Sequence, residues 1–134
     1  MSREEQPVYA IGAFRTVGGL SAWLTPNLLA RVYGGTGPDA ESLLWSRLAS
    51  SRELALAVGP ILSEGPERRR WLLLGLACDF ADMAATLIGN RRGGRLSPRS
   101  TIPALATYSV SALLTGWALR SSRPDALEAA GLQE

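Results

Sequence analysis

The sequence of 134 residues contains no histidine and no lysine, so all 14 of its basic residues are arginine. A nucleophile activated by a histidine base and a Schiff base on a lysine amine are therefore both excluded. The single cysteine, Cys78, has no second cysteine for an internal disulfide and no metal-ligand partner at a motif spacing. We expect it to be a small, buried, apolar side chain.

An excess of charge of one sign is also lacking, because 14 arginines stand against 12 acidic residues and leave a net charge of +2. No segment combines dense arginine with interleaved aromatic residues, which argues against nucleic acid as a partner. The glycine-rich residues 34–38 lack the lysine and hydroxyl residue of a phosphate-binding loop, so they predict a turn. With 46% hydrophobic and 19% charged residues, the chain predicts one folded domain over residues 1–134.

Four apolar stretches of similar length are present at residues 8–33, 42–62, 71–89 and 101–120, separated by short polar segments. Alanine and leucine dominate them, they are longer than ordinary strands, and apolar and polar residues do not alternate, so each predicts a helix. Residues 121–134 contain a proline and mixed charges and predict a loose or partly helical tail. The predicted fold class is all-α.

The distribution of polar residues favours a membrane around these helices. The mean hydropathy of +0.06 does not discriminate between membrane and water. Residues 101–119, however, contain no ionisable side chain except Tyr108, whereas a helix in water needs a strongly polar face. A bilayer core of roughly 30 Å requires about 20 predominantly apolar residues per helix. We therefore predict a four-helix transmembrane bundle, a multi-pass protein of the cell membrane in contact with the lipid bilayer; a soluble helical bundle is the alternative.

Other features bear on the membrane prediction without deciding it. Arginines divide six to five between the two predicted sides, which gives no orientation. Glu4 and Glu5 replace the basic region of a signal peptide, so we expect none to be cleaved. Four tryptophans near the ends of their stretches are either interfacial anchors or packing residues: Trp23, Trp45, Trp71 and Trp117. Small residues that would allow close helix contacts are Gly12, Gly18, Gly19, Ala22, Ala81, Ala84, Ala85 and Gly116.

Ionised side chains within the apolar stretches are the strongest functional signal. Each costs about 2.5–3.5 kcal/mol at the centre of a bilayer, so we expect them to pair with one another. Their formal charges add to zero, which allows a bundle to hold them without a residual charge. Arg47, like Arg31, lies near the end of a stretch, from where its side chain can reach the interface. The six groups are Arg15, Arg47, Arg52, Glu53, Asp79 and Asp82.

Sequence spacing suggests how these groups are paired. Asp79 and Asp82 are three residues apart, so both lie on one face of their helix. Arg52 and Glu53 are adjacent and point about 100° apart, so we expect them to serve different partners. Glu53 is expected to approach Arg15, and Arg52 to approach Asp79 or Asp82.

The motifs at residues 47–57 and 74–82 resemble those of an uncharacterised family of small four-helix integral membrane proteins of actinobacteria and fungi. That family carries an Arg-acid-Leu-Ala-Leu run in its second helix and an Asp-x-x-Asp pair in its third, and residues 26–33 look like the end of its first helix. The resemblance covers roughly residues 10–119. Members often have a histidine in the last helix, which this chain lacks, so no histidine-dependent role carries over. The resemblance implies the architecture and supports the choice of Arg52, Glu53, Asp79 and Asp82.

These residues predict a site for a lipophilic small molecule, and the protein is expected either to bind it or to act on it as a cyclase, isomerase or epoxide-opening enzyme. The expected catalytic residues are Glu53, Asp79 and Asp82, which would exchange protons with the substrate. Arg15, Arg52 and Tyr108 are the expected substrate-binding residues. No cofactor is required. A metal held by the three carboxylates is disfavoured, because the arginines compete electrostatically.

A non-enzymatic role is the alternative. Buried ion pairs also fix the register of packed helices, so the same charges are equally expected in a membrane subunit or scaffold. Such a protein would present its helix faces to another copy of itself or to a larger membrane complex.

Overall fold

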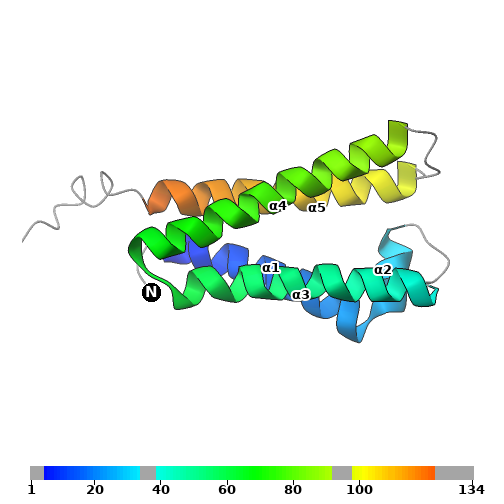
Figure 1. The fold of residues 1–134 in the computed structure, drawn as a ribbon, viewed down its shortest axis with the longest axis horizontal. Coiled ribbons are helices and arrows are strands. Elements are labelled where there is room, and N and C mark those ends of the chain that lie inside the picture. The colour runs from blue at the N-terminus through cyan, green and yellow to red at the C-terminus, as the bar shows by residue number, and fades with distance from the viewer. Residues whose placement is uncertain (1–4, 34–38, 92–97, 123–134) are drawn as a thin grey trace, which may run out of the picture.

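The computed structural model describes residues 5–33, 39–91 and 98–122, and this part of the chain is helical with no strand. Its five helices are α1 (Gln6–Leu24), α2 (Pro26–Val32), α3 (Ala40–Leu62), α4 (Gly65–Arg91) and α5 (Pro98–Ser121). The four long helices form two layers, α1 with α3 and α4 with α5, and run antiparallel within each layer (Figure 1). Contacts of α1 with α5 and of α3 with α4 join the layers. The all-α fold class is confirmed.

The predicted helix over residues 8–33 is wrong in one respect, because the chain breaks at Thr25 into α1 and α2. Thr25 has φ −134° and ψ 53°, outside the helical region. The residue before a proline is disfavoured in the helical conformation, and the ring of Pro26 has no N–H to continue the helical hydrogen bonds. The short α2 therefore turns away from α1 and stands at one end of the molecule (Figure 1).

The long helices also extend beyond their predicted ends. Asp39 caps α3, where its side chain accepts a hydrogen bond of 2.8 Å from the Ser42 N–H, which lowers the pKa of this carboxyl below its usual value. Residues 65–70, predicted to be loop, form the first turns of α4. Gly65 adopts a positive φ of 51°, which glycine tolerates, and Pro66 suits the start of a helix. Likewise α5 begins at Pro98, and most of the predicted tail lies outside the described residues.

Along the long axis of the molecule, the interior changes from an apolar cluster to ionised side chains and then to a cavity. Val8, Ile11, Leu72 and Ala118 form a buried apolar cluster at the end where α1 begins. Ionised side chains occupy the middle. Towards the α2 end the two layers separate (Figure 1), and a cavity described below lies there. The apolar cluster therefore anchors one end of the molecule, and the charged level borders the open end.

Two of the four predicted spans, α4 over Gly65–Asn90 and α5 over Pro98–Ser121, are long and apolar enough to cross a membrane by length and composition. Only 17% of each apolar window is buried inside the protein. Among the described residues, α1 and α3 do not reach the same threshold, and α3 carries Arg47, Arg52 and Glu53 within its length. Both candidate spans thus direct most of their apolar surface outward.

Two of the small residues allow the close contact between α1 and α3. A Cβ on Gly12 would come within 2.7 Å of Ile61 Cδ1, and a Cβ on Gly19 within 2.9 Å of Leu54 Cγ. In contrast, Gly18 and Gly116 have open space around the Cβ position. The three alanines of α4 predicted to lie in helix contacts are exposed instead: Ala81, Ala84 and Ala85.

The tryptophans also fall into an exposed group and a packed one. Trp23, Trp45 and Trp117 are exposed, as anchors at an interface would be. Trp71 instead packs on Gly59, where a Cβ would meet its ring at 2.4 Å. The expectation that Cys78 is fully buried is wrong, because its side chain is only half-buried.

Replacing Gly19 with alanine should lower the thermal unfolding midpoint of the purified protein. The added Cβ would meet Leu54 and, at 3.1 Å, the carbonyl oxygen of Ser50, so a helix must shift at a cost of about 1–3 kcal/mol. Gly18→Ala is the matched control, because it has open space and gains helix propensity of about 1 kcal/mol. Circular dichroism would show the midpoints moving in opposite directions; equal shifts would contradict the close α1–α3 contact.

Candidate functional site

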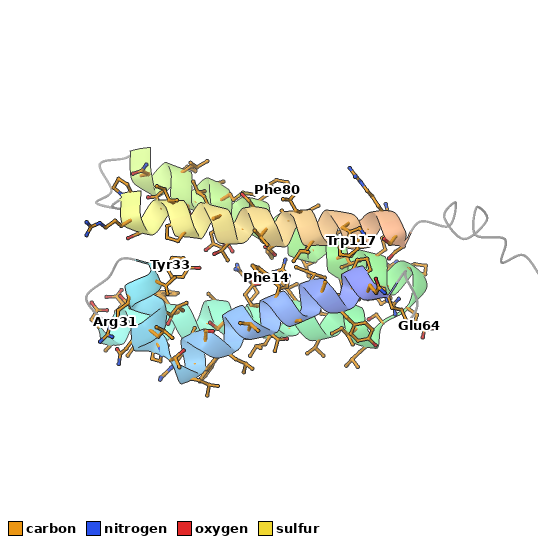
Figure 2. All side chains as sticks on the ribbon, turned by 180° about the vertical axis from the view of Figure 1, so that it is seen from behind. Phe14, Arg31, Tyr33, Glu64, Phe80 and Trp117 are labelled. Carbon is orange, nitrogen blue, oxygen red and sulfur yellow. The ribbon has the colours of Figure 1, made fainter. Side chains whose placement is uncertain are left out.

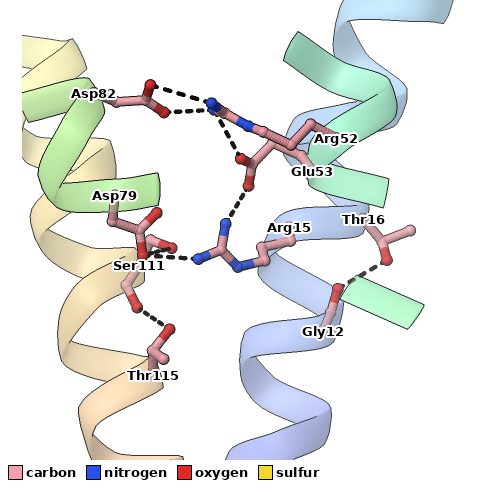
Figure 3. Close-up of polar contacts among 9 residues, drawn as sticks. All are labelled: Gly12, Arg15, Thr16, Arg52, Glu53, Asp79, Asp82, Ser111 and Thr115. Atoms are coloured by element: carbon pink, nitrogen blue, oxygen red, sulfur yellow. Dashed lines mark hydrogen bonds and ion pairs between the residues drawn. The ribbon is translucent and has the colours of Figure 1, made fainter. Parts of the chain in front are cut away.

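A chain of alternating charges crosses the middle of the molecule from α4 to α3 to α1 and back to α4 (Figure 3). It runs Asp82, Arg52, Glu53, Arg15 and Asp79, so each guanidinium lies between two carboxylates. This ion-pair chain brings together all five ionised residues predicted for the site. The expected pair of Glu53 with Arg15 is present, and of the two aspartates expected for Arg52 it pairs with Asp82.

Arg15 is nearly fully buried, with 3% of its surface exposed. Its Nη1 donates to Glu53 Oε2, and its Nη2 donates to Asp79 Oδ2 at 2.7 Å. Gly75 makes room for the guanidinium, because a Cβ there would lie 3.0 Å from Nη2. Gly75 was not predicted, although it stands four residues before Asp79 and hence on the same face of α4.

Arg52 forms the other half of the chain and is 39% exposed at its side chain. Its Nη2 donates to Asp82 Oδ2 at 2.5 Å and to Glu53 Oε1 at 3.2 Å. The expectation that Arg52 and Glu53 serve separate partners only is therefore wrong. Their long side chains bend towards each other at the tips, although their Cα–Cβ bonds diverge. The buried Nε of Arg52 has no hydrogen-bond partner among the described residues.

Asp79 connects the ion-pair chain to α5 through a hydroxyl group. Ser111 Oγ donates to Asp79 Oδ2 at 3.0 Å, and Thr115 Oγ1 donates to the Ser111 carbonyl at 2.9 Å. All three residues are buried. Ser111 was not predicted. The available signal was its i, i+4 spacing to Thr115, which places two hydroxyl residues on one face of the helix.

Arg47 does not belong to the ion-pair chain. It lies over the Trp23 ring with its Cζ atom 5.4 Å from the ring centre, and its side chain is exposed. The six charges therefore do not form one neutral group, and Arg47, expected to reach towards the interface from near the end of its stretch, is engaged elsewhere. Arg31 is exposed as well, near the end of the molecule where α2 lies (Figure 2).

A cavity of about 510 Å³ adjoins the ion-pair chain on the side of α2. Arg15, Arg52, Glu53 and Asp79 form its charged end. Figure 2 shows Phe14 between the two layers and Tyr33 pointing from α2 towards α5. The remaining lining residues are apolar or hydroxyl-bearing: Val17, Gly18, Ala22, Leu29, Ser46, Ala49, Ser50, Ala104, Thr107, Tyr108 and Ser111. Tyr108, predicted to bind substrate, thus lines the same cavity as the charged residues.

The far wall of the cavity is held by a contact between α2 and α5. The hydroxyl groups of Tyr33 and Thr107 are 3.1 Å apart, and Thr107 also donates to the Pro103 carbonyl. Within the described residues, no group of three or more histidine, cysteine or carboxylate side chains is arranged to hold a metal ion. The three carboxylates of the site are separated by the two guanidinium groups (Figure 3).

Comparison with known proteins finds no match: no protein-family model, no curated protein and no solved structure matches this chain.

Replacing Arg15 with glutamine should cost about 3–5 kcal/mol in the free energy of unfolding, because Asp79 and one oxygen of Glu53 lose their partner. The control is Arg70→Gln, which removes an exposed pair with Glu67 and should cost no more than about 1 kcal/mol. Reversible unfolding in detergent measures both. The double variant Arg15→Gln/Asp79→Asn should be less destabilised than the sum of its single changes, because no unpaired charge is left between them.

Proposed function

We propose that this protein is a multi-pass membrane protein that binds a lipophilic small molecule in the cavity beside the ion-pair chain. The observation that carries this proposal is the combination of a largely apolar outer surface with a charged, cavity-lining interior. Globular proteins in water have the reverse arrangement.

The outer surface supports the membrane part of the proposal. Large apolar side chains are exposed on every long helix, among them Val17 at 68%, Leu62 at 79% and Leu113 at 74%. Phe80 on α4 is also exposed and points outward (Figure 2). A soluble monomer rarely exposes so many large apolar side chains, whereas lipid tails would cover them without cost. The low buried share of α4 and α5 argues against the core helices of a soluble protein.

The position of the ionised groups supports it further. Among the described residues, ionised side chains lie in the ion-pair chain or towards the two ends of the molecule, where Arg31 and Glu64 mark opposite ends (Figure 2). Arg47 is two turns inside α3, and its stacking on Trp23 suits the interface region of a bilayer. The α5 helix of 24 residues would be about 36 Å long, enough to cross a hydrocarbon core of about 30 Å.

The cavity supports the proposal that the protein binds a small molecule. Its volume is that of typical small-molecule sites, which combine apolar walls with a few convergent polar groups. Intramembrane ionisable residues commonly mark substrate or ion sites. The acid/base cyclase or isomerase activity stays a prediction, with Glu53, Asp79 and Asp82 as its proton-exchanging groups. The scaffold role is the competing hypothesis, and the experiments below separate it from ligand binding.

In cells expressing the full chain, we expect the protein to stay in the membrane pellet after extraction with alkaline carbonate and to enter solution in mild detergent. Peripheral proteins are released by carbonate, because it removes electrostatic attachment but leaves the hydrophobic insertion intact. Immunoblotting of the fractions measures the distribution. Recovery in the carbonate supernatant would contradict the membrane part of the proposal.

Filling the cavity should remove its ligand. Ala104→Phe places a ring inside the cavity, whereas Ala106→Phe, two residues along α5, places the same ring on the exposed face. Mass spectrometry of solvent extracts from the purified proteins should detect a lipophilic molecule with the parent and with Ala106→Phe, and at least tenfold less with Ala104→Phe.

The scaffold hypothesis predicts the opposite. No lipophilic molecule would then co-purify above the detergent background, and the three proteins would give the same extract. Thermal unfolding of each preparation shows whether Ala104→Phe is folded, so that loss of ligand is separated from loss of structure.

A further inference from the structure

The ion-pair chain contains one more acidic than basic group. Two guanidinium groups, those of Arg15 and Arg52, alternate with three carboxylates, so both ends of the chain are acidic and its formal charge is −1 (Figure 3). No other arginine of the described residues pairs with these carboxylates, since Arg47 lies over the Trp23 ring. The imbalance is thus a property of the arrangement in space, not of the number of charges in the apolar stretches.

A single uncompensated charge in apolar surroundings is costly, and such a group is neutralised by a bound proton or by a counter-ion. The exposed ends of the molecule offer other charges, but those lie in or near water. A positively charged group that enters the cavity would neutralise the chain directly, because Glu53 and Asp79 line the cavity.

The cavity has features that receive such a group. Asp79 Oδ2 accepts from both Arg15 and Ser111, whereas Oδ1 accepts no hydrogen bond from the described residues. The side chain of Asp79 is 2% exposed. Aromatic rings of Phe14, Tyr33 and Tyr108 line the same cavity. Ring faces attract cations, and they do so more strongly where water is excluded.

We propose that the ligand of this cavity is a lipophilic monocation, such as a quaternary ammonium or phosphonium compound, and that it exchanges with one proton at the ion-pair chain. This inference rests on the proposed function and specifies its ligand class. No covalent bond changes: one cation enters, and the proton that neutralised the empty chain leaves to water.

The groups that face the ion-pair chain and the cavity come from all five helices. Arginine stays charged, so the carboxylates are the groups that exchange the proton. Among the described residues the set is Arg15 on α1, Tyr33 directly after α2, Arg52 and Glu53 on α3, Cys78, Asp79 and Asp82 on α4, and Tyr108 on α5.

Three probes of similar shape but different charge test the proposal on the purified full chain: tetraphenylphosphonium, its anionic counterpart tetraphenylborate, and neutral triphenylphosphine oxide. Binding to the cavity is measured as the amount of probe bound by the parent protein minus the amount bound by Ala104→Phe. This difference removes the contribution of probe that partitions into detergent. We expect tetraphenylphosphonium to bind at least tenfold more tightly than the other two. Its affinity should fall between pH 7.5 and 5, by up to tenfold per pH unit, because cation and proton compete for one charge.

Asp82→Asn is the informative variant, because Asp82 pairs with Arg52 but does not line the cavity. The change makes the chain formally neutral and leaves the walls of the cavity as they are. It should reduce the preference for the cation at least tenfold and remove the pH dependence. Glu67→Gln is the control, since it neutralises an exposed carboxylate at the start of α4 and should change neither.

The results separate the two proposals. Equal binding of all three probes by the parent protein at every pH would overturn the cation inference and keep the lipophilic site. Absence of binding by all three would overturn the site as well. Were Asp82→Asn to unfold, the comparison of cation with anion in the parent protein and its pH dependence would still decide the question.

Discussion

The structure depends on the pairing of Arg15 with two carboxylates from two other helices. A guanidinium that is nearly fully buried is tolerated only if its N–H groups find acceptors, and Glu53 and Asp79 supply them. Because these partners sit on α3 and α4, one side chain of α1 ties three helices in a single register. Gly75 completes the arrangement by leaving the space that the guanidinium fills.

This pairing also explains why the molecule is closed at one end and open at the other. Between the start of α1 and the ion-pair chain, apolar residues such as Ile11 and Leu72 fill the interior. Beyond the ion-pair chain, α1 ends at Leu24 and the layers separate, and the described residues form no buried apolar cluster there. The ion-pair chain therefore lines one end of a cavity and is not enclosed by apolar side chains on both sides. Charges placed at such a boundary remain within reach of a ligand.

The sequence predicted the helices, the inward position of the charges, the pair of Arg15 with Glu53 and a pair of Arg52 with one of the two aspartates of α4, because helical periodicity and the cost of burial determine these. It placed Arg47 within reach of the interface but did not predict that its guanidinium stacks on Trp23. Whether an arginine two turns inside a helix turns inward or stacks on a neighbouring ring depends on the distance between α1 and α3, which residue spacing does not encode. Ser111 was not predicted for a similar reason, because its hydrogen bond to Asp79 depends on which face of α5 meets α4. The membrane topology, the ligand and the resemblance to the small membrane protein family stay predictions.

The four long helices are not held equally. Three of them contribute ionised groups to the chain, whereas α5 contributes a neutral hydroxyl at Ser111 and, at its other contact with the cavity, the hydroxyl of Thr107. Among the described residues, displacing α5 sideways would break hydrogen bonds between uncharged partners or with one carboxylate, but none of the ion pairs of the chain. Under the proposed function, a gap beside α5 would let a molecule from lipid reach the cavity while the ion-pair chain stays intact.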